Sequence, residues 1–533
     1  MIAQQDAVAF SSWLTERVAR YGSYPAIEIG GITRTYAELG AASDRLGVGL
    51  VGLGVQPGSR VAVLLGNTPA HIDTWFALGK LGAVEIPVNI AYTGELLRFM
   101  LGQCRAEMVI CDAARLPEVA DAAVGLPLLR AIVCADGDDR LASAAPVGVH
   151  SLAGLYQEGE FRSADTGPSS PGVILFSSGT TGPPKGILHS SGGCVRLGQY
   201  NAEVMGYGPG DVLWNCFPLF HQNARYTGVI PALDVGAKIV LEARFSASRF
   251  WDNARSKGVT AFNYLGAVIQ LLWNQPPGPA DREHAITRAF GAGAPKEIWP
   301  QFEERFGVAL TEVYGLTEAP MATVNRRPGE LHSCGRSSDL FEVAVVDQED
   351  RQITGETGEI VVRPKIPCAF MLGYDNAPEV TVEAFRNLWF HTGDRGRMSA
   401  GGDLYFVDRQ KDCIRRRGEN ISSWEIESVL ARHPGVLESA AYAVPSQFSD
   451  DEVMVALVPR PGAELDPAQV HEFCAGQLPA YAVPSYIRVM AALPHTPTER
   501  VQKFRLRAEG VTADAWQSKE IQVSEQRRAG GSR

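Results

Sequence analysis

Short apolar runs alternate with helix-length segments in the first half of this chain, and this alternation limits the folds open to it. Residues 61–65 and 84–88 have the composition of buried strands, and residues 69–82 between them carry apolar side chains at helical spacing. Similar apolar runs return at 108–111 and 131–134. Repeated strand–helix–strand units predict parallel sheets packed with helices, so we expect an α/β fold.

The pattern changes near residue 408, and the length of 533 residues also exceeds one ordinary core. Beyond that point Ser422 and Asp466 each begin a helix-capping pattern, with two apolar runs between them that indicate antiparallel strands. We therefore expect a large N-terminal domain over 1–408 and a small, mobile α+β domain over 409–517, joined by a hinge. The polar tail over 518–533 is expected to be disordered.

One loop carries the strongest functional signal. Residues 174–189 contain an apolar run, a turn rich in glycine and hydroxyl groups, Lys185, and a second apolar run. Glycines let backbone N–H groups converge on phosphate oxygens, although such a loop by itself is often plain surface. The spacing is not that of a Walker A motif, which disfavours a P-loop NTPase. The loop residues expected to contact phosphate are Ser177, Ser178, Gly179, Thr180, Thr181 and Gly182.

Three further segments come after this loop, at residues 311–318, 355–363 and 391–394. Together with the loop they resemble the adenylate-forming superfamily, which includes acyl-CoA synthetases, luciferases and nonribosomal adenylation domains. The sequence of segments 218–224, 262–267 and 415–425 looks most like the crotonobetaine/carnitine-CoA ligase-like branch. The resemblance implies an ATP-dependent ligase that activates a carboxylic acid as acyl-AMP and then transfers it to CoA, with a domain rotation between the two steps.

The resemblance also assigns roles in the first step. It places Lys185 and Thr317 near the ATP phosphates and Glu318 on Mg²⁺, a hard cation that prefers oxygen ligands. Asp394 and Arg409 match the positions that hold the ribose hydroxyls. The positions expected to surround the adenine are Gly291, Ala292, Gly293, Ala294, Pro295, Tyr314 and Gly315.

For the second step the resemblance points to three positions. His221 matches the gate between the acyl pocket and the pantetheine tunnel of CoA, Lys411 the hinge, and Gly418 a loop that lines the tunnel. A lone histidine after an apolar run is otherwise more often structural. The segments expected to line the acyl pocket are 222–224, 262–266 and 319–321.

The superfamily's usual C-terminal lysine is missing. Glu499 and Arg500 stand where the superfamily has glycine and lysine, and Lys503, about one helical turn further on, is an alternative source of the missing charge. Arginine keeps the charge, but its planar head does not reproduce a compact ammonium. Three functions stay open: an acyl-CoA ligase with Arg500 as the catalytic cation, a nucleotide-binding module without turnover, and an adenylating enzyme for another oxyanion or acceptor, such as a nitrite-using diazotase acting on an aromatic amine.

The composition of the chain argues against some classes of binding partner. A net charge of −11 without a basic stripe argues against nucleic acid and anionic membranes. The nine cysteines lack zinc-site spacing, and no signal peptide or apolar run of membrane-spanning length is evident. We therefore expect a cytoplasmic enzyme whose partners are ATP and a small carboxylic acid or other oxyanion; enzymes of this architecture are often homodimers.

Overall fold

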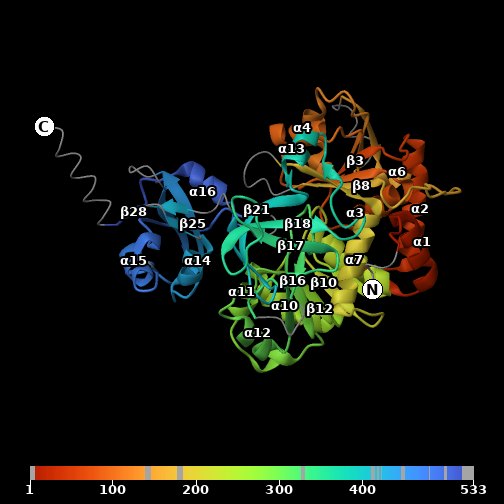
Figure 1. Ribbon diagram of the computed structural model, residues 1–533. Helices are drawn as coiled ribbons and strands as arrows, with labels where there is room; N and C mark the ends of the chain where they lie inside the picture. Colours follow the sequence, from red (N-terminus) through yellow and green to blue (C-terminus); the bar gives the residue numbers. More distant parts are fainter. Residues whose placement is uncertain are drawn as a thin grey trace.

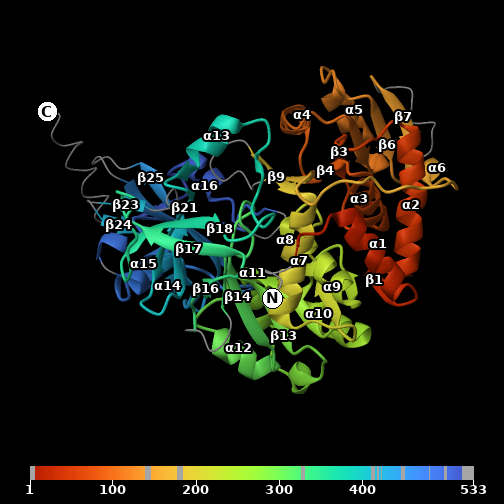
Figure 2. The ribbon, with the colours of Figure 1, turned by 45° about the vertical axis from the view of Figure 1, so that its right-hand side comes forward.

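The chain folds into a large N-terminal domain followed by a smaller C-terminal domain, drawn in blue in Figures 1 and 2. The fold is mixed α/β, as predicted. The computed structural model describes residues 6–137, 146–176, 184–325, 331–409, 414–416, 419–421, 423–445, 451–478, 480–496 and 501–518.

One large sheet, the A sheet, collects strands that are far apart in the chain. Its strands are β1 (Pro25–Ile29), β2 (Ile32–Thr35), β10 (Val212–Asn215), β11 (Lys238–Leu241), β12 (Ala261–Leu265), β13 (Arg288–Ala292), β14 (Ala309–Tyr314), β15 (Thr323–Val324) and β16 (Arg336–Ser337). They lie in the order β16-β15-β14-β13-β12-β10-β11-β1-β2, and the stretch from β14 to β1 is parallel. The carboxyl ends of β12, β13 and β14 therefore meet at one edge.

A second sheet, the B sheet, contains the predicted alternating runs. Its strands are β3 (Arg60–Leu64), β4 (Val84–Pro87), β5 (Met108–Cys111), β6 (Ala131–Cys134), β7 (Gly148–Ser151), β8 (Pro171–Phe176), β9 (Gly186–Ser190) and β19 (Gly373–Tyr374). Their order is β19-β9-β8-β4-β3-β5-β6-β7. Strands β8 and β9 pair antiparallel, so the predicted phosphate loop connects their adjacent ends.

Helices cover both sheets. They are α1 (Phe10–Tyr21), α2 (Tyr36–Gly52), α3 (Pro69–Leu81), α4 (Gly94–Gln103), α5 (Leu116–Ala123), α6 (Leu152–Leu155), α7 (Ser191–Met205), α8 (Gln222–Ala224), α9 (Ile230–Val235), α10 (Ala247–Lys257), α11 (Gly266–Trp273) and α12 (Trp299–Phe306), with the 3₁₀ turns η2 (Ala113–Arg115) and η5 (Pro279–Arg282) and the π-helix η4 (Arg225–Val229). Helix α3 spans the predicted segment because Thr68 caps its first turn, Pro69 occupies the first helical position and Gly82, at φ 65°, ends it. Among the described residues no helix is long and apolar enough to cross a membrane.

The main core lies between the two sheets. Side chains of α1, α3, α7 and α9, such as Trp13, Phe76, Val195 and Leu233, form one buried cluster with strand residues of both sheets. Burying this helix layer on both sides removes a large apolar area from water, which holds the sheets at a defined separation.

The alternation in the sequence gave no indication of a third, antiparallel sheet. It consists of β17 (Phe341–Val346), β18 (Thr357–Pro364), β20 (Phe385–Arg386), β21 (Trp389–Met398) and β22 (Leu404–Arg409), and α13 (Pro378–Glu383) precedes β20. The segments 355–363 and 391–394 lie on its neighbouring strands β18 and β21, which pair directly. This sheet brings residues after position 390 toward the A sheet.

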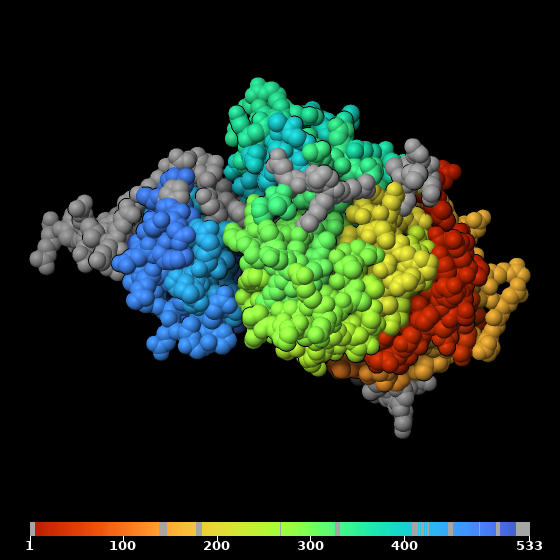
Figure 3. All heavy atoms as spheres, turned by 90° about the horizontal axis from the view of Figure 1, so that it is seen from below, coloured from red at the N-terminus to blue at the C-terminus, as the bar shows by residue number. Residues whose placement is uncertain are grey.

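The C-terminal domain has the predicted α+β pattern. It contains β23 (Ile414–Arg416), β24 (Glu419–Ile421), α14 (Ser423–Ala431), β25 (Val436–Pro445), β26 (Asp451–Pro459), α15 (Pro467–Ala475), η6 (Ala480–Ala482), β27 (Tyr486–Val489), α16 (Lys503–Glu509) and β28 (Trp516–Gln517). Strands β25 and β26 are antiparallel, and the Asp466 side chain caps α15 by accepting from the Ala468 amide at 2.9 Å, as predicted. Figure 3 shows this blue domain at one end of the molecule, beside the green middle part of the chain. The boundary at 408/409, the mobility of this domain and the disorder of the tail predicted over 518–533 stay predictions, and residues 519–533 lie outside the described part of the chain.

Candidate active site

Several predicted site residues lie outside the described part of the chain. These are Ser177, Ser178, Gly179, Thr180, Thr181, Gly182, Lys411, Gly418 and Arg500. The other predicted residues lie at or just after the carboxyl ends of A-sheet strands, beside β9, before α8 and on β21 and β22. Their geometry can be traced directly.

The predicted adenine turn is held by a buried glutamate. After β13 the chain turns at Gly293, whose φ of 79° lies in the left-handed region that favours glycine. The carboxylate of Glu312, on the neighbouring strand β14, accepts hydrogen bonds from the amides of Gly293 and Ala294 and, at 2.9 Å, from the Tyr264 hydroxyl. A Cβ at Gly291 would lie 2.7 Å from ring atoms of Tyr264, so glycine lets Tyr264 cross β13 to reach Glu312.

The environment of Glu312 is strongly desolvating. Burial raises the pKa of Glu312 to about 7, against the opposing effects of the Gly293 and Ala294 amides, the Tyr264 hydroxyl and the Lys296 charge. The sequence analysis had Tyr264 within the predicted acyl-pocket segment 262–266 and Glu312 within the motif at 311–318, but it did not predict that they hold the adenine turn. A signal existed for Glu312, because it lies two residues before Tyr314 on one strand and therefore on the same face.

The predicted adenine and ribose residues are brought together. The hydroxyl of Tyr314 donates to Oδ2 of Asp394 at 2.8 Å, and both side chains are buried. Asp394 is the cross-strand partner of Arg409 in the antiparallel pair β21–β22. The Tyr314 ring also lies nearly parallel to that of Phe406, at 6.1 Å between ring centres. Three segments that are distant in the sequence therefore meet at one point.

Thr317 and Glu318 lie in the irregular segment after β14, which is not a helix start. Nε2 of His189 lies 2.8 Å from the carbonyl oxygen of Thr317, and because a carbonyl only accepts, Nε2 carries the hydrogen. Burial lowers the pKa of His189 to about 4, so the ring is neutral near pH 7. The Glu318 carbonyl accepts from the Met371 amide at 3.1 Å. The backbone of both residues is thus held by β9 and by the segment that precedes β19.

Tyr374 contacts both Glu318, the predicted Mg²⁺ ligand, and Lys185, which is predicted to lie near the phosphates. Its hydroxyl donates to Oε1 of Glu318 at 2.8 Å, and Nζ of Lys185 lies 5.0 Å from the centre of its ring, within cation–π range. Burial and the charge of Glu318 raise the pKa of the Tyr374 hydroxyl. The carboxylate of the neighbouring Asp375 accepts a hydrogen bond from each terminal nitrogen of Arg60, both at 2.8 Å, and these bonds anchor the segment to β3. The sequence analysis missed Tyr374 and His189, since nothing local marks either one.

The donor set fits Mg²⁺ that arrives with ATP. Within the described ranges no group of three or more His, Cys, Asp or Glu side chains could hold a metal ion. Glu318 supplies one carboxylate, oriented by Tyr374. Mg²⁺ is usually bound through one or two carboxylates, waters and substrate phosphates, so a single protein carboxylate suits a metal–nucleotide complex.

His221 precedes α8, and two of the predicted acyl-pocket segments meet beside it. The Asn263 side chain donates to the Thr227 carbonyl at 3.0 Å, and the Thr227 hydroxyl donates to the Asn223 carbonyl at 2.7 Å. Asn263 and Thr227 are buried. This chain of bonds joins segment 262–266 to segment 222–224 through the π-helix η4, so two of the three predicted acyl-pocket segments are contiguous.

Lys503 is not a ready substitute for the missing lysine. Its Nζ lies 2.8 Å from Oε1 of Glu427 and donates to the Ser423 hydroxyl at 2.5 Å. Both partners belong to α14, so the ammonium is engaged inside the C-terminal domain.

A Glu312→Gln variant tests the buried carboxyl group. Because the folded pKa of about 7 exceeds the ordinary value of 4.5, the native protein binds a proton that the unfolded chain has released between these pH values. This stabilisation is complete below pH 4.5 and disappears as the pH rises through 7, whereas glutamine does not titrate. Denaturant titrations should therefore show wild type losing about 3 kcal/mol relative to the variant across this window. A difference independent of pH would contradict the assignment.

Most of the chain matches one protein family. Residues 14–374 match the AMP-binding enzymes, and residues 425–500 match the AMP-binding enzyme C-terminal domain. The chain is similar to crotonobetaine/carnitine–CoA ligase of Salmonella paratyphi A, with 30% identity over 492 residues that cover 90% of this chain and 94% of that protein. The first match spans well over half of the chain, and the relative is covered almost completely.

Solved structures share the fold. The anthranilate CoA ligase AuaEII in complex with anthranoyl-AMP has a TM-score of 0.85, with 23% identity over 95% of this chain and 98% of that one. ATP-bound MatB from Rhodopseudomonas palustris has a TM-score of 0.82, with 24% identity over 94% and 99%. The chain therefore belongs to the AMP-binding enzymes, the adenylate-forming superfamily of the acyl-CoA synthetases, and is an enzyme of the acyl-CoA ligase type.

Proposed function

We propose that this enzyme activates a carboxylic acid as acyl-AMP with ATP and then transfers the acyl group to CoA. One observation carries the proposal: two kinds of contact meet at the end of β14. Tyr314, the last residue of this strand, donates a hydrogen bond to Asp394. Glu318, four residues later, accepts one from Tyr374, whose ring lies beside Lys185. A nucleoside and its phosphates need these two kinds of contact next to each other. The similarity to a crotonobetaine/carnitine–CoA ligase over 90% of the chain supports CoA as the acceptor.

In the proposed first step a carboxylate oxygen attacks the α-phosphorus of ATP, and the bond from that phosphorus to the bridging oxygen breaks to release pyrophosphate. Thr317 contacts the α-phosphate, while Lys185 and Arg500 offset the negative charge that builds up there. Mg²⁺, when bound by Glu318 and the phosphates, supplies further charge neutralisation. Residues 177–182 are proposed to wrap the phosphates, since loops of this composition present several N–H groups.

The nucleoside is proposed to lie along the edge formed by β13, β14 and β21. The turn from Gly291 to Pro295 and the Tyr314–Gly315 pair flank the adenine. Asp394 and Arg409 hold the ribose hydroxyls, since a carboxylate can accept from both hydroxyls of a diol. The Tyr314 hydroxyl also donates to Oδ2 of Asp394, which links the proposed adenine and ribose contacts.

In the proposed second step the CoA sulfur attacks the acyl carbon, AMP leaves, and the thiol proton is released. Rotation of the C-terminal domain about Lys411 brings Gly418 to the tunnel, and His221 separates the tunnel from the acyl pocket. We propose a small or medium-sized acid as substrate, a cytoplasmic location and a homodimer, with neither nucleic acid nor membrane as partner.

Arg500 is the observation that favours a second candidate. Where the family's cation is a lysine, an arginine can bind a different oxyanion through two N–H groups. The second candidate is therefore an adenylating enzyme with another oxyanion or acceptor, such as a diazotase that activates nitrite for an aromatic amine. A nucleotide-binding module without turnover is less favoured, because the Tyr374–Glu318 contact orients a carboxylate suited to Mg²⁺.

Mass spectrometry separates these functions. The enzyme is incubated with ATP, Mg²⁺ and a pool of carboxylic acids, aromatic amines and nitrite, with and without CoA. We expect an acyl-CoA mass that depends on CoA and accompanies AMP, and a fall of at least about 100-fold in Glu318→Gln because metal-bound phosphate loses its carboxylate. Glu304→Gln, at an exposed glutamate of α12, is the matched control and should retain activity. AMP with an N–N or amide product and no thioester would establish the second candidate instead.

Tyr374→Phe tests the orientation of Glu318. Removing the hydroxyl leaves the carboxylate without its 2.8 Å donor, so the geometry offered to Mg²⁺ becomes less defined. The Mg²⁺ concentration for half-maximal pyrophosphate release should rise about 10-fold, a common effect for groups that orient a metal ligand. The phenylalanine ring keeps its packing under Lys185, so ATP affinity serves as the internal control. An unchanged Mg²⁺ dependence would remove Tyr374 from the site.

Arg500 variants test the catalytic cation. We expect Arg500→Ala to slow acyl-AMP formation at least about 100-fold and Arg500→Lys to slow it much less, because lysine restores the charge. Transfer of preformed acyl-AMP to CoA should be unaffected in both variants and is the control. Normal adenylation by Arg500→Ala would show that another group supplies the charge.

A further inference from the structure

A salt bridge lies completely inside the N-terminal domain, between the two sheets. Arg225, the first residue of η4, donates to both carboxylate oxygens of Glu85 on β4, at 2.7 and 2.6 Å. Arg225 and Glu85 are 0% and 1% exposed, and the guanidinium carbon lies 4.2 Å from the centre of the Trp75 ring. Desolvating two charges costs several kcal/mol per ion, and apolar residues of similar volume are often as stabilising. Stability is therefore a poor explanation for this pair.

The guanidinium also reaches the backbone. Its Nε donates to the carbonyl oxygen of Leu219, in the stretch of residues 217–221 that ends at His221 and is called the gate segment below. Because both terminal nitrogens are tied to Glu85, the plane of the guanidinium cannot rotate and the direction of the bond to Leu219 is set. A neutral side chain on the same helix would have no such fixed direction.

Asn67, in the loop between β3 and α3, forms hydrogen bonds to the same segment. Its Oδ1 accepts from the Leu219 amide at 2.9 Å, and its Nδ2 donates to the Phe217 carbonyl at 3.1 Å. The amide of His221 closes a turn onto the Pro218 carbonyl at 2.9 Å. Both backbone polar groups of Leu219 are thus held from outside the gate segment, and the turn carries that constraint to His221.

His71 lies between the Arg225–Glu85 pair and the loop that bears Asn67. Its Nδ1 lies 3.0 and 3.1 Å from the carbonyl oxygens of Leu65 and Gly66, directly before Asn67. Its Nε2 lies 3.4 Å from Oε1 of Glu85. Because carbonyl oxygens only accept, Nδ1 carries the hydrogen, and Nε2 can accept from Nη2 of Arg225, which lies 3.4 Å away. The Arg225–Glu85 pair therefore contacts the gate segment directly and the loop bearing Asn67 through His71.

We propose that the buried Arg225–Glu85 pair is a positioning device for the gate segment, and that it serves the thioester-forming step by holding His221 at the boundary between the acyl group and CoA. Arg225 and Glu85 are positioning residues, since they act through Leu219. The inference rests on the proposed function, which gives His221 its role. It explains why the fold retains a desolvated ion pair where an apolar pair would pack.

The test replaces both charges together. Arg225→Met with Glu85→Leu leaves no buried charge unpaired, so the melting temperature should stay near that of wild type, apart from the cost of one unpaired carbonyl. The Leu219 carbonyl loses its donor. We expect acid-dependent exchange of pyrophosphate into ATP to stay within about 2-fold, while single-turnover transfer from preformed acyl-AMP to CoA slows about 10- to 100-fold, the usual range for a displaced catalytic element.

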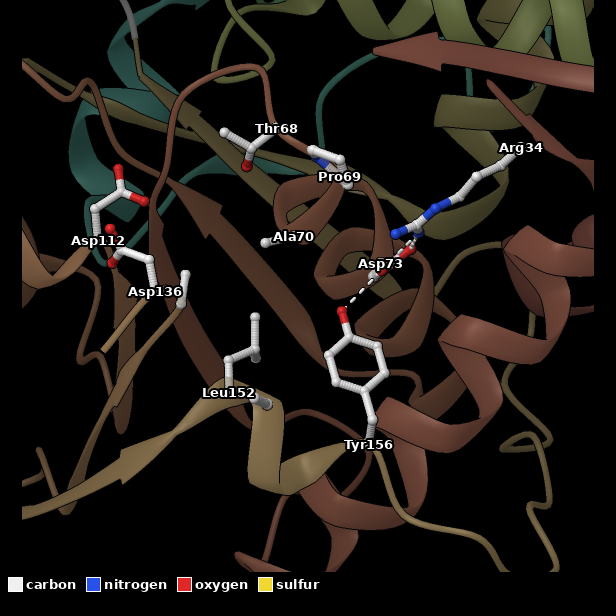
Figure 4. A pocket seen from close by; sticks show the side chains of 11 residues that line it. Arg34, Thr68, Pro69, Ala70, Asp73, Asp112, Asp136, Leu152 and Tyr156 are labelled. Atoms are coloured by element: carbon white, nitrogen blue, oxygen red, sulfur yellow. Dashed lines mark hydrogen bonds and ion pairs between the residues drawn. The ribbon is translucent and has the colours of Figure 1, made fainter. Parts of the chain in front are cut away.

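A control removes another ion pair beside the same helix, α3, in which the carboxylate is buried and the arginine is partly exposed. Arg34 donates to both oxygens of Asp73 on α3, at 2.7 and 2.8 Å, and the Tyr156 hydroxyl also donates to Asp73 at 2.7 Å. These side chains line a pocket of about 570 Å³, shown in Figure 4, and their described contacts do not include the gate segment. Arg34→Met with Asp73→Leu should leave both half-reactions unchanged.

The outcomes separate this inference from the proposed function. A selective loss of the CoA step supports positioning by the pair. An unchanged CoA step, or an equal loss in both half-reactions with a lower melting temperature, overturns it even if wild-type enzyme makes thioester. If wild-type enzyme forms an adenylate but no thioester with any acid, the proposed function itself fails and the inference falls with it.

Discussion

The burial of one helix layer between two largely parallel sheets is the constraint on which the rest of the structure depends. Helices α1, α3, α7 and α9 fill this layer with apolar side chains and set the separation of the sheets. In the A sheet the parallel strands all present their carboxyl ends at one edge. The turns after β12, β13 and β14 therefore become neighbours, and the segment β8–β9 of the B sheet faces them through the contact of His189 with Thr317.

Buried polar side chains complete this arrangement. Glu312 holds the turn after β13, His189 and Tyr374 hold Thr317 and Glu318, and Arg225 holds the gate segment. Glu312, His189 and Arg225 are buried and Tyr374 is half-buried, and each forms a hydrogen bond to the site or to a segment beside it. An unpaired buried polar group is costly, so each such contact is rigid once it forms. An apolar frame places the strand ends, and these polar side chains orient the turns and loops beyond the strand ends.

Much of the fold can be predicted from local patterns. The apolar runs of the B sheet, the extent of helix α3, and two strands and two helix starts of the C-terminal domain were predicted, because strand and helix periodicity and capping are properties of short segments. The antiparallel sheet β17–β22 was not, since its strands pair across loops without a repeated rhythm. The roles of Glu312, Tyr264, His189 and Tyr374 were missed for a related reason: each acts on a residue of another segment.

The sequence alone determined the pieces and their chemistry: the α/β class, the glycine- and hydroxyl-rich loop with Lys185, the Thr317–Glu318 and Asp394 motifs, and the membership in the adenylate-forming superfamily that the family match confirms. Only the tertiary structure decided which of these pieces touch. Tyr314 and Asp394 are 80 positions apart, and Arg225 and Glu85 are 140 apart. Local propensity depends on residues that are close together in the sequence. Contacts between distant residues depend instead on how whole sheets pack, and no pattern within one segment identifies its partner in another.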